Sequence, residues 1–401
     1  MPNYLINNDI ENAENPENIW DNFLLSQKFE YPRQLPTLNN SVLDFCTNDY
    51  LGVNSIPEIK LGLNNHLINL IKNTDINIGA TGSRLLSGNS QSHIKLEELI
   101  AKTKGSQNAL IFNSGYQANA SVLTAILKNL DTNKVKIFSD KANHASLHYV
   151  FQSLHLKQIR YAHNNLDHLE QRLKKYAKAG DYICIVTESV FGMDGDITDL
   201  IRLINIAANY NAMLYIDEAH ATGILGNNGY GLASNLFNIY PNLIVMGTFS
   251  KAIGVSGGYI ACSNIMKNYL INTCGGFIYS TAASHLLMEA VYYIWDKIST
   301  PYFKQLRNNL EATSGYIRKA LQDLGFDIGI SNSHIIPIIL KDVEKSQKMH
   351  TYLIQNGIKT SHIRPPTVAP NTARIRLSLC ANHTLNEVKQ LVSIMQNLKR
   401  N

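Results

Sequence analysis

The sequence predicts an α/β fold, with a large domain built on a mostly parallel sheet and a smaller α+β domain after it. Between about residues 108 and 262, short apolar runs alternate with longer amphipathic stretches. Each run has the length of a buried strand, and this rhythm is typical of strands joined by crossover helices. After about residue 290 the rhythm changes. We therefore expect a lead-in segment at 1–45, a large domain at 46–290 and a small domain at 291–401.

Six apolar runs are the expected strands of the large domain: NALIFN, VKIFS, YICIVTE, AMLYID, LIVMG and GYIAC. Stretches of helical length, such as 164–178 and 199–209, separate most of them. The small domain is expected to begin with a long helix at about 292–324. HIIPIIL and ARIRLSL then predict two strands, and helices are expected at 343–356 and 385–398.

Composition excludes several classes of protein. Hydrophobic residues make up 45% of the 401 residues and charged residues 17%, which indicates a folded globular chain. The net charge of +5 is spread along the chain, so nucleic-acid binding is not expected. The five cysteines form no Cys-x-x-Cys pair and the histidines no metal-binding spacing, which predicts a reduced, cytoplasmic chain without a metal. No signal peptide and no apolar run of about 18 residues is present, so no membrane partner is expected.

Polar or glycine-rich segments follow five of the expected strands. Because functional groups of open α/β sheets gather beyond the carboxyl ends of the strands, we expect these segments to share one crevice. In chain order they begin with Ser114-Gly115-Tyr116, Asp140 with His144, Glu188, Asp217 to His220, and Gly247 to Lys251.

Lys251 is the strongest single candidate. It is the one charged residue of GTFSKAIGVSGG, among small and apolar neighbours that let another molecule approach closely. A lysine held in an apolar pocket has a lowered pKa and becomes a nucleophile or a base. A solvated loop lysine is the alternative interpretation.

The other candidates are ambiguous when taken singly. Asp217 ends an apolar strand, where a carboxylate needs a partner, but it could equally cap the next helix. His220 and His144 could each be an ordinary hydrogen-bonded loop histidine. Ser114-Gly115 opens a predicted helix and offers free N–H groups to a phosphate. DEAH also occurs in helicases, but the chain has no Walker loop; nor does it have a Gly-x-Ser-x-Gly elbow or a strand followed by Gly-x-Gly-x-x-Gly.

Together these residues suit pyridoxal 5'-phosphate (PLP). That cofactor needs a lysine for a Schiff base, a carboxylate for its pyridine nitrogen, a side chain that stacks on the ring and a phosphate site at a helix start. The sequence therefore predicts a PLP enzyme, and no metal.

The order of eight motifs also resembles the α-oxoamine synthases: NDYLG, GATGSRLLSGNSQSH, NSGYQAN, DKANHASL, TESVFGMDGD, DEAHATGILG, GTFSKAIG and YSTA. The resemblance runs from about Asn48 to the C-terminus. It implies the PLP-dependent transferase fold of the aspartate-aminotransferase type (fold type I). Members condense an amino acid with an acyl thioester, release carbon dioxide, and form homodimers that share their active sites.

Within the family, residues 363–379 are most similar to members that join L-alanine to a pimeloyl thioester in biotin biosynthesis. The acyl carrier is either coenzyme A or an acyl carrier protein. A glycine-using member and a non-catalytic partner subunit are the alternatives. The second tends to lack the Schiff-base lysine, and this chain has Lys251.

The resemblance implies a role for each matching position. Lys251 would hold the cofactor as a Schiff base and then act as general base. Asp217 would pair with the pyridine nitrogen, His220 with the ring hydroxyl, and His144 would stack on the ring. The phosphate would be bound by Gly115, Tyr116, Thr248 and Ser250, and by Ser280 and Thr281 of YSTA in the neighbouring subunit.

The substrate contacts implied by the resemblance are Arg364, Asn48 and Thr367. Arg364 would clamp the amino-acid carboxylate, as a guanidinium fork does well. Asn48 would lie near the cofactor or substrate, and Thr367 near the acyl group.

The chain departs from the family at two places. Gly192 stands where the family often has a serine, which predicts the loss of one hydrogen bond to the cofactor. The segment QKFEYP carries only Lys28 where relatives have an arginine-rich stretch, so Lys28 is the remaining candidate for the far end of the acyl chain.

Overall fold

The computed structural model describes residues 19–27, 42–74 and 76–400, and the chain divides into two compact units, 1–41 and 42–401. In the first unit the described part is the helix α2, Ile19–Ser26, which exposes Trp20 and Phe23. Lys28 lies outside the described residues.

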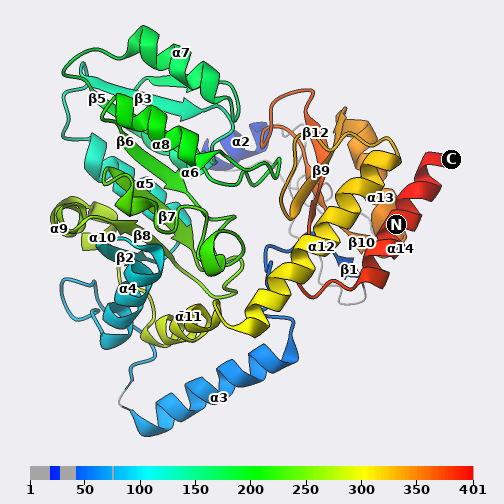
Figure 1. The fold of residues 1–401 in the computed structure, drawn as a ribbon, viewed down its shortest axis with the longest axis horizontal. Helices are drawn as coiled ribbons and strands as arrows, with labels where there is room; N and C mark the ends of the chain where they lie inside the picture. The colour runs from blue at the N-terminus through cyan, green and yellow to red at the C-terminus, as the bar shows by residue number, and fades with distance from the viewer. Residues whose placement is uncertain (1–18, 28–41, 75, 401) are drawn as a thin grey trace. The chain divides into compact units, whose positions relative to one another are not determined.

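Within the described residues, the main sheet of the second unit has seven strands in the order β2-β8-β7-β6-β5-β3-β4 (Figure 1). The pairs among β7, β6, β5, β3 and β4 are parallel, and only β8 runs antiparallel to its neighbours. The predicted, mostly parallel sheet is therefore confirmed. The strands are β2 Asn108–Phe112, β3 Val135–Asp140, β4 Gln158–Tyr161, β5 Tyr182–Glu188, β6 Met213–Asp217, β7 Leu243–Thr248 and β8 Gly258–Cys262.

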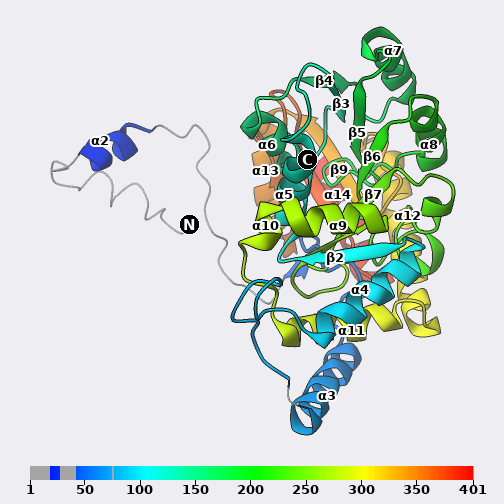
Figure 2. The same ribbon diagram turned by 90° about the vertical axis from the view of Figure 1, so that its left-hand side faces the viewer.

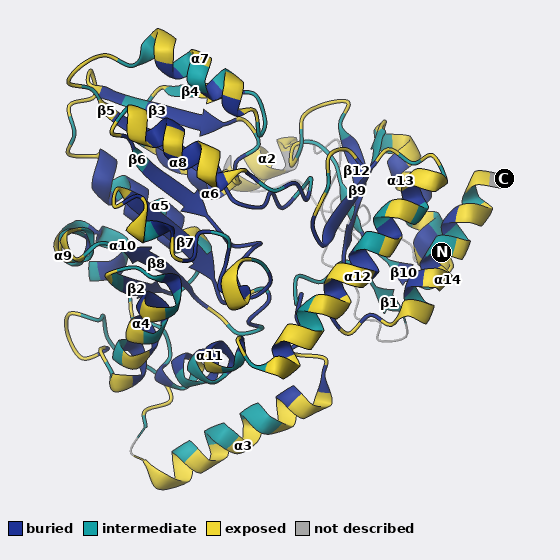
Figure 3. Cartoon of the chain, viewed as in Figure 1, coloured by how far each residue is buried: buried dark blue, intermediate teal, exposed yellow. Residues whose placement is uncertain are grey.

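Helices cover both faces of this sheet, and this explains why its strands are continuous apolar runs. In β5, Ile183 and Ile185 belong to one buried cluster while Cys184 and Val186 belong to the other. The strands are dark in the burial view and the outer sides of the helices are exposed (Figure 3). The face with Cys184 is covered by α5 Gly115–Leu127, α6 Ala145–Ser153 and α9 Asn264–Thr273, and the other by α4 Gln91–Lys104, α7 Leu166–Tyr176, α8 Leu200–Asn209 and α11 His285–Lys297 (Figure 2).

The C-terminal part contains a second sheet, in which β12 lies between β11 and β9 with antiparallel pairing. A short strand β1 pairs in parallel with β10. The remaining bounds are β1 Leu43–Asp44, β9 Ile335–Lys341, β10 Ile358–Lys359, β11 Ser361–Ile363, β12 Ala373–Ser378, α3 Pro57–Asn73, α10 Gly275–Ile278, α12 Pro301–Asp323, α13 Val343–Gln355 and α14 Leu385–Arg400.

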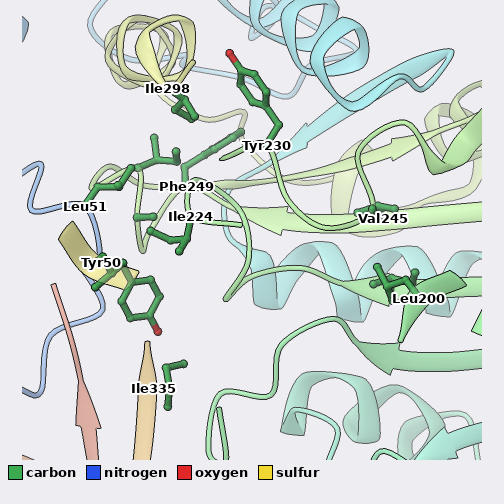
Figure 4. Close-up of a cluster of buried hydrophobic side chains, with 14 of the residues drawn as sticks. Tyr50, Leu51, Leu200, Ile224, Tyr230, Val245, Phe249, Ile298 and Ile335 are labelled. Carbon is green, nitrogen blue, oxygen red and sulfur yellow. The ribbon is translucent and has the colours of Figure 1, made fainter. Parts of the chain in front are cut away.

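One buried cluster extends from the main sheet into the C-terminal sheet. Figure 4 shows part of it, with Tyr50, Phe249 and Ile335 from distant parts of the chain. The expected domain boundary near residue 290 falls within α11, and we keep the division into 46–290 and 291–401 as a proposal. In the described part of the chain no helix is long and apolar enough to cross a membrane, and no group of side chains there could hold a metal ion.

Candidate active site

Lys251 lies in the loop between β7 and β8, at the carboxyl edge of the parallel strands. Its Nζ is 2.8 Å from Nε2 of His220. Burial lowers the pKa of Lys251 to about 8, against the opposing carboxylates of Asp217 and Glu188, and the charge of Arg376 adds to the lowering. A lysine with this pKa carries a reactive neutral amine close to neutral pH.

His220 follows β6 in the DEAH segment and is buried. Its Nδ1 is 2.7 Å from the hydroxyl of Tyr50, so both ring nitrogens have partners. Burial, with the charges of Lys251 and Arg376, holds the pKa of His220 well below its usual range. His220 is therefore a neutral imidazole directed at Lys251.

Asp217 ends β6 and is buried, as its place after an apolar strand suggested. Its Oδ1 accepts a hydrogen bond from the backbone N–H of Ala219 at 2.8 Å, and Oδ2 accepts one from Nδ2 of Asn119 at 2.8 Å. The residues after Asp217 form turns and no helix, so the helix-cap alternative is wrong. The carboxylate is held rigidly by N–H donors.

Asn119 connects Asp217 to His144, and sequence reasoning missed it. Its Nδ2 also donates to Oγ of Ser146 at 2.9 Å, and its Oδ1 accepts from the hydroxyl of Tyr215 at 2.8 Å. Ser146 Oγ is 2.7 Å from Nδ1 of His144. An asparagine on the sheet-facing side of α5, four residues after Gly115, was the available signal.

His144 precedes α6 and is neutral. Its Nδ1 accepts from the backbone N–H of Ser146 at 3.3 Å, which leaves the ring hydrogen on Nε2. Burial lowers its pKa and the charge of Lys251 adds to this, although Asp217 opposes both. The backbone N–H of His144 donates to Oε1 of Glu188 at 2.6 Å. Burial and the neighbouring Asp217 raise the pKa of Glu188 well above its usual range.

The start of α5 packs closely against the end of β7 and the start of β8. Ser114 caps the helix by accepting from the N–H of Gln117 at 3.0 Å, and Gly115 and Tyr116 are first-turn donors without intrahelical acceptors. A Cβ on Gly115 would lie 3.4 Å from Cβ of Thr248, and a Cβ on Gly258 would lie 2.8 Å from N of Gly115. This approach therefore requires glycine at position 258, whereas a Cβ at position 115 would make an ordinary contact.

Hydroxyl groups line the same turn. Thr248 Oγ1 donates to the carbonyl of Gly257 at 2.9 Å and accepts from the N–H of Ser250 at 3.2 Å. Ser280 Oγ accepts from Nδ2 of Asn113 at 3.0 Å, and Thr281 O accepts from the same amide at 2.8 Å. The structure thus brings Ser280 and Thr281 beside the Ser114 turn of their own chain, and their reach into a neighbouring subunit stays a prediction.

Arg376 is a second residue that sequence reasoning missed. It lies on β12, is buried, and donates from Nη2 to Oδ1 of Asn48 at 2.7 Å and to the hydroxyl of Tyr50 at 3.3 Å. Its Nε is buried without a hydrogen-bond partner in the described part of the chain. Charged residues alternating in the apolar strand ARIRLSL were the available signal; the other one, Arg374, pairs with Asp194.

Arg364, the predicted carboxylate clamp, lies in the segment before β12. It follows β11, and its charge lowers the pKa of His350 and of His362, where burial is the larger cause. Thr367 N–H donates to the carbonyl of Arg364 at 3.0 Å, so the two share one turn. Their roles at the substrate stay predictions.

Gly192 lies against His220. A Cβ at this position would lie 2.8 Å from Cε1 and 3.0 Å from Cδ2 of the imidazole, and closer still to Nε2. The ring of His220 therefore occupies the space that a side chain at position 192 would take.

Comparisons with known proteins identify the family of this chain. The model of the family Aminotransferase class I and II matches residues 40–395. The putative 8-amino-7-oxononanoate synthase of Bordetella pertussis is 38% identical over 367 residues, which cover 91% of this chain and 89% of that protein. The 8-amino-7-oxononanoate synthase of Gluconacetobacter diazotrophicus is 38% identical over 364 residues, covering 90% of this chain and 88% of that protein.

Two solved structures have the same fold. Serine palmitoyltransferase from S. paucimobilis, solved with a bound compound of PLP and myriocin, has a TM-score of 0.80 at 24% identity, with 90% of this chain and 87% of that chain covered. The 8-amino-7-oxononanoate synthase from Francisella tularensis has a TM-score of 0.74 at 28% identity, with 90% and 99% covered. The predicted fold type is confirmed.

Proposed function

We propose a function from one premise: the chain belongs to the aminotransferase class I and II family, whose model spans residues 40–395. It is a PLP-dependent acyltransferase that condenses L-alanine with a pimeloyl thioester and releases carbon dioxide, forming 8-amino-7-oxononanoate in biotin biosynthesis. One observation carries this proposal. Curated relatives at 35–39% identity, each aligned over 86–91% of this chain, have the name 8-amino-7-oxononanoate synthase or putative 8-amino-7-oxononanoate synthase.

The residues present fit PLP. The Gly115 turn leaves first-turn N–H groups beside the Thr248 hydroxyl, which suits a phosphate. The buried carboxylate of Asp217, fixed by two N–H donors, suits a protonated pyridine nitrogen. Lys251 would attach to the cofactor, and His144 would stack on it. When bound, PLP supplies an electron sink for the negative charge that develops at Cα of the amino acid.

Lys251 also moves the proton. Its amine, neutral above about pH 8, would take the Cα proton of alanine on Nζ and later return a proton to the product. A positioned general base of this kind typically contributes roughly 10²–10⁴-fold to the rate. His220, neutral and hydrogen-bonded to Nζ, orients the amine for this transfer.

For the carboxylate of alanine we propose Arg376, with Asn48 beside it, in place of the predicted Arg364. The charge of Arg376 lowers the pKa of Lys251 and of His220. The charge of Arg364 instead lowers the pKa of His350 and of His362. The buried Nε of Arg376 also needs an acceptor, which a carboxylate supplies. Thr367 remains the candidate for the acyl side.

We propose that the enzyme is a cytoplasmic homodimer with shared active sites. Ile78, Leu86 and Tyr279 have exposed fractions of 74%, 83% and 86%. They lie on neighbouring segments, since Thr281 bridges to Ser83. Exposed apolar side chains gathered in this way mark an interface. Leu86→Arg should give a mass of one chain in sedimentation, and an unchanged dimer would contradict this face.

The function is tested with the purified full-length protein, PLP and pairs of substrates. L-alanine with pimeloyl-CoA or pimeloyl carrier protein should release carbon dioxide and give 8-amino-7-oxononanoate, identified by mass spectrometry. Faster turnover of glycine with acetyl-CoA would overturn the assignment. Comparing the two pimeloyl thioesters identifies the acyl carrier.

A further inference from the structure

Behind Lys251, a chain of hydrogen bonds between buried and half-buried side chains leads away from the site. Nζ of Lys251 is 2.8 Å from Nε2 of His220, and Nδ1 of His220 is 2.7 Å from the hydroxyl of Tyr50. That hydroxyl donates to Oδ1 of Asn48 at 3.0 Å and accepts from Nη2 of Arg376 at 3.3 Å. Tyr50 belongs to the NDYLG segment, and nothing in the reaction proposed above assigns it a role.

This chain determines which nitrogen of His220 carries the hydrogen. The Tyr50 hydroxyl lies 3.0 Å from Oδ1 of Asn48 and 2.7 Å from Nδ1 of His220. Because the charged amine of Lys251 can only donate to Nε2, we infer that Nδ1–H donates to the Tyr50 oxygen and that the Tyr50 hydrogen goes to Asn48. A neutral imidazole with its hydrogen on Nδ1 has a lone pair on Nε2. Nε2 of His220 therefore accepts a hydrogen bond from Lys251.

Gly192 controls the same ring from the other side. A Cβ there would lie within 3.0 Å of Cε1 and Cδ2 of His220, a separation that requires the ring or the backbone at position 192 to move. The sequence predicted that Gly192 removes one hydrogen bond to the cofactor. The structure adds a different consequence, which is that Gly192 leaves the space in which His220 reaches Lys251.

We propose that Tyr50 and Gly192 are positioning residues for Lys251: Tyr50 fixes the tautomer of His220, and Gly192 makes room for its ring, so that Nε2 accepts a hydrogen bond from the lysine amine. This inference rests on the proposed role of Lys251 as the base. An acceptor at 2.8 Å favours the charged form of an amine. Through His220, Tyr50 and Gly192 therefore make Lys251 a stronger base than burial alone would allow.

Several charged or titratable groups face Lys251, and all must be kept when Tyr50 and Gly192 are substituted. Asp217 and Glu188 come from the ends of β6 and β5, Arg376 comes from β12, and His220, His144 and His334 complete the set. Neither Tyr50→Phe nor Gly192→Ala removes any of them. The phenyl ring of Tyr50→Phe also keeps the edge-on contact with His334, whose ring centroid is 4.1 Å away.

The test measures the titration of Lys251 itself. The full-length chain, freed of cofactor, is pulse-labelled with acetic anhydride across the alkaline pH range, and the peptide containing Lys251 is quantified by mass spectrometry. In Tyr50→Phe the midpoint should fall by roughly half a unit to one unit, because the ammonium loses its fixed acceptor. Gly192→Ala should give the same shift. The double variant should shift no further, because both substitutions act through His220.

Tyr230→Phe is the matched control. It also removes one buried tyrosine hydroxyl, which donates to the carbonyl of Trp295 at 3.3 Å, and it should leave the titration of Lys251 unchanged. A midpoint in Tyr50→Phe equal to that of the wild type, or additive shifts in the double variant, would overturn the proposal. Circular dichroism checks that each variant is folded. Labelling uses no substrate, so failure of the synthase assay leaves this result intact.

Discussion

Two lysines contact the DEAH segment: Lys104, which is buried, contacts Glu218, and Lys251, which is half-buried, contacts His220. Lys104, on α4, forms an ion pair with Glu218 and donates to the carbonyl of Tyr230 at 2.8 Å. Burial opposes its charge, but Glu218 and Tyr259 together outweigh burial and raise the pKa of Lys104. Lys251 has the neutral ring of His220 as its hydrogen-bond partner, and burial lowers its pKa to about 8.

The difference between the two lysines comes from the contacts of two adjacent carboxylates. Asp217 and Glu218 are neighbours in sequence, yet Asp217 is held by Asn119 and Ala219 while Glu218 pairs directly with a lysine. A carboxylate in direct contact keeps an ammonium charged and inert. A carboxylate that acts from a distance leaves the amine able to lose its proton. The contact partner, more than burial, separates a structural lysine from a reactive one.

The largest expected effect is that of Lys251→Ala. Turnover of alanine and pimeloyl thioester should fall by at least roughly 10²–10⁴-fold, because both the attachment point and the base are lost. The free energy of unfolding should change by no more than about 1 kcal/mol. Steady-state assays and urea unfolding measure the two quantities. Retained turnover would refute the assignment of Lys251 as the base.

Lys104→Met should have the reverse pattern. Removing the lysine leaves Glu218 buried without its cation, which costs about 3–5 kcal/mol of unfolding free energy. The folded fraction should keep its turnover number. Adding Glu218→Gln, which can still accept from the N–H of Ala233, should restore most of the loss. A stable single variant would show that the two lysines do not differ as argued.

How far the sequence could predict this site depends on how its contacts are spread along the chain. Lys251, Asp217 and His220 were predicted because each stands out against its immediate neighbours. Asn119, Tyr50 and Arg376 were missed because their contacts span long separations. Asn119 meets Asp217 across 98 residues, Tyr50 meets His220 across 170, and Arg376 meets Asn48 across 328. No local pattern indicates such pairs.

Burial explains which strands of the main sheet the sequence predicted and which one it did not. The six predicted strands are all present, since a strand buried on both faces is a continuous apolar run. Strand β4, with the sequence QIRY, was not predicted. It lies at the edge of the sheet, pairs with β3 alone among the described strands and exposes Arg160, so burial imposes no apolar run on it.

The third prediction concerns Arg376, whose charge lowers the pKa of Lys251. Arg376→Lys should raise KM for alanine by roughly 10- to 100-fold, because a hydrogen bond to a charged group contributes about 1.5–3 kcal/mol. Arg364→Lys is the matched control and should change KM much less. The opposite order in steady-state kinetics would restore Arg364, the arginine predicted from sequence, as the carboxylate clamp.

His163, a half-buried cation, extends the comparison and has the smallest expected effect. Its Nδ1 and Nε2 lie 3.2 Å from Asp140 and 3.1 Å from Asp196. Burial opposes the charge, but these hydrogen bonds outweigh it and raise the pKa of His163 to about 10. His163 thus resembles Lys104: direct carboxylate contacts keep it charged. It links the loop that carries His144 to the loop that carries Gly192.

The sign of the pH dependence follows from this pKa. Because the folded pKa lies above the ordinary value of about 6.5, the contribution of the charged ring to stability is complete below about pH 6.5 and is lost as the pH rises through about 10. His163→Gln should therefore cost roughly 1–3 kcal/mol in urea unfolding at neutral pH, and this difference from the wild type should vanish above about pH 10.

His148→Gln is the control. Burial lowers the pKa of His148, so its ring is already neutral at pH 7 and the difference should stay constant over the same range. A constant difference for His163→Gln as well would mean that the two aspartates hold a neutral ring, and that His163 does not belong with Lys104.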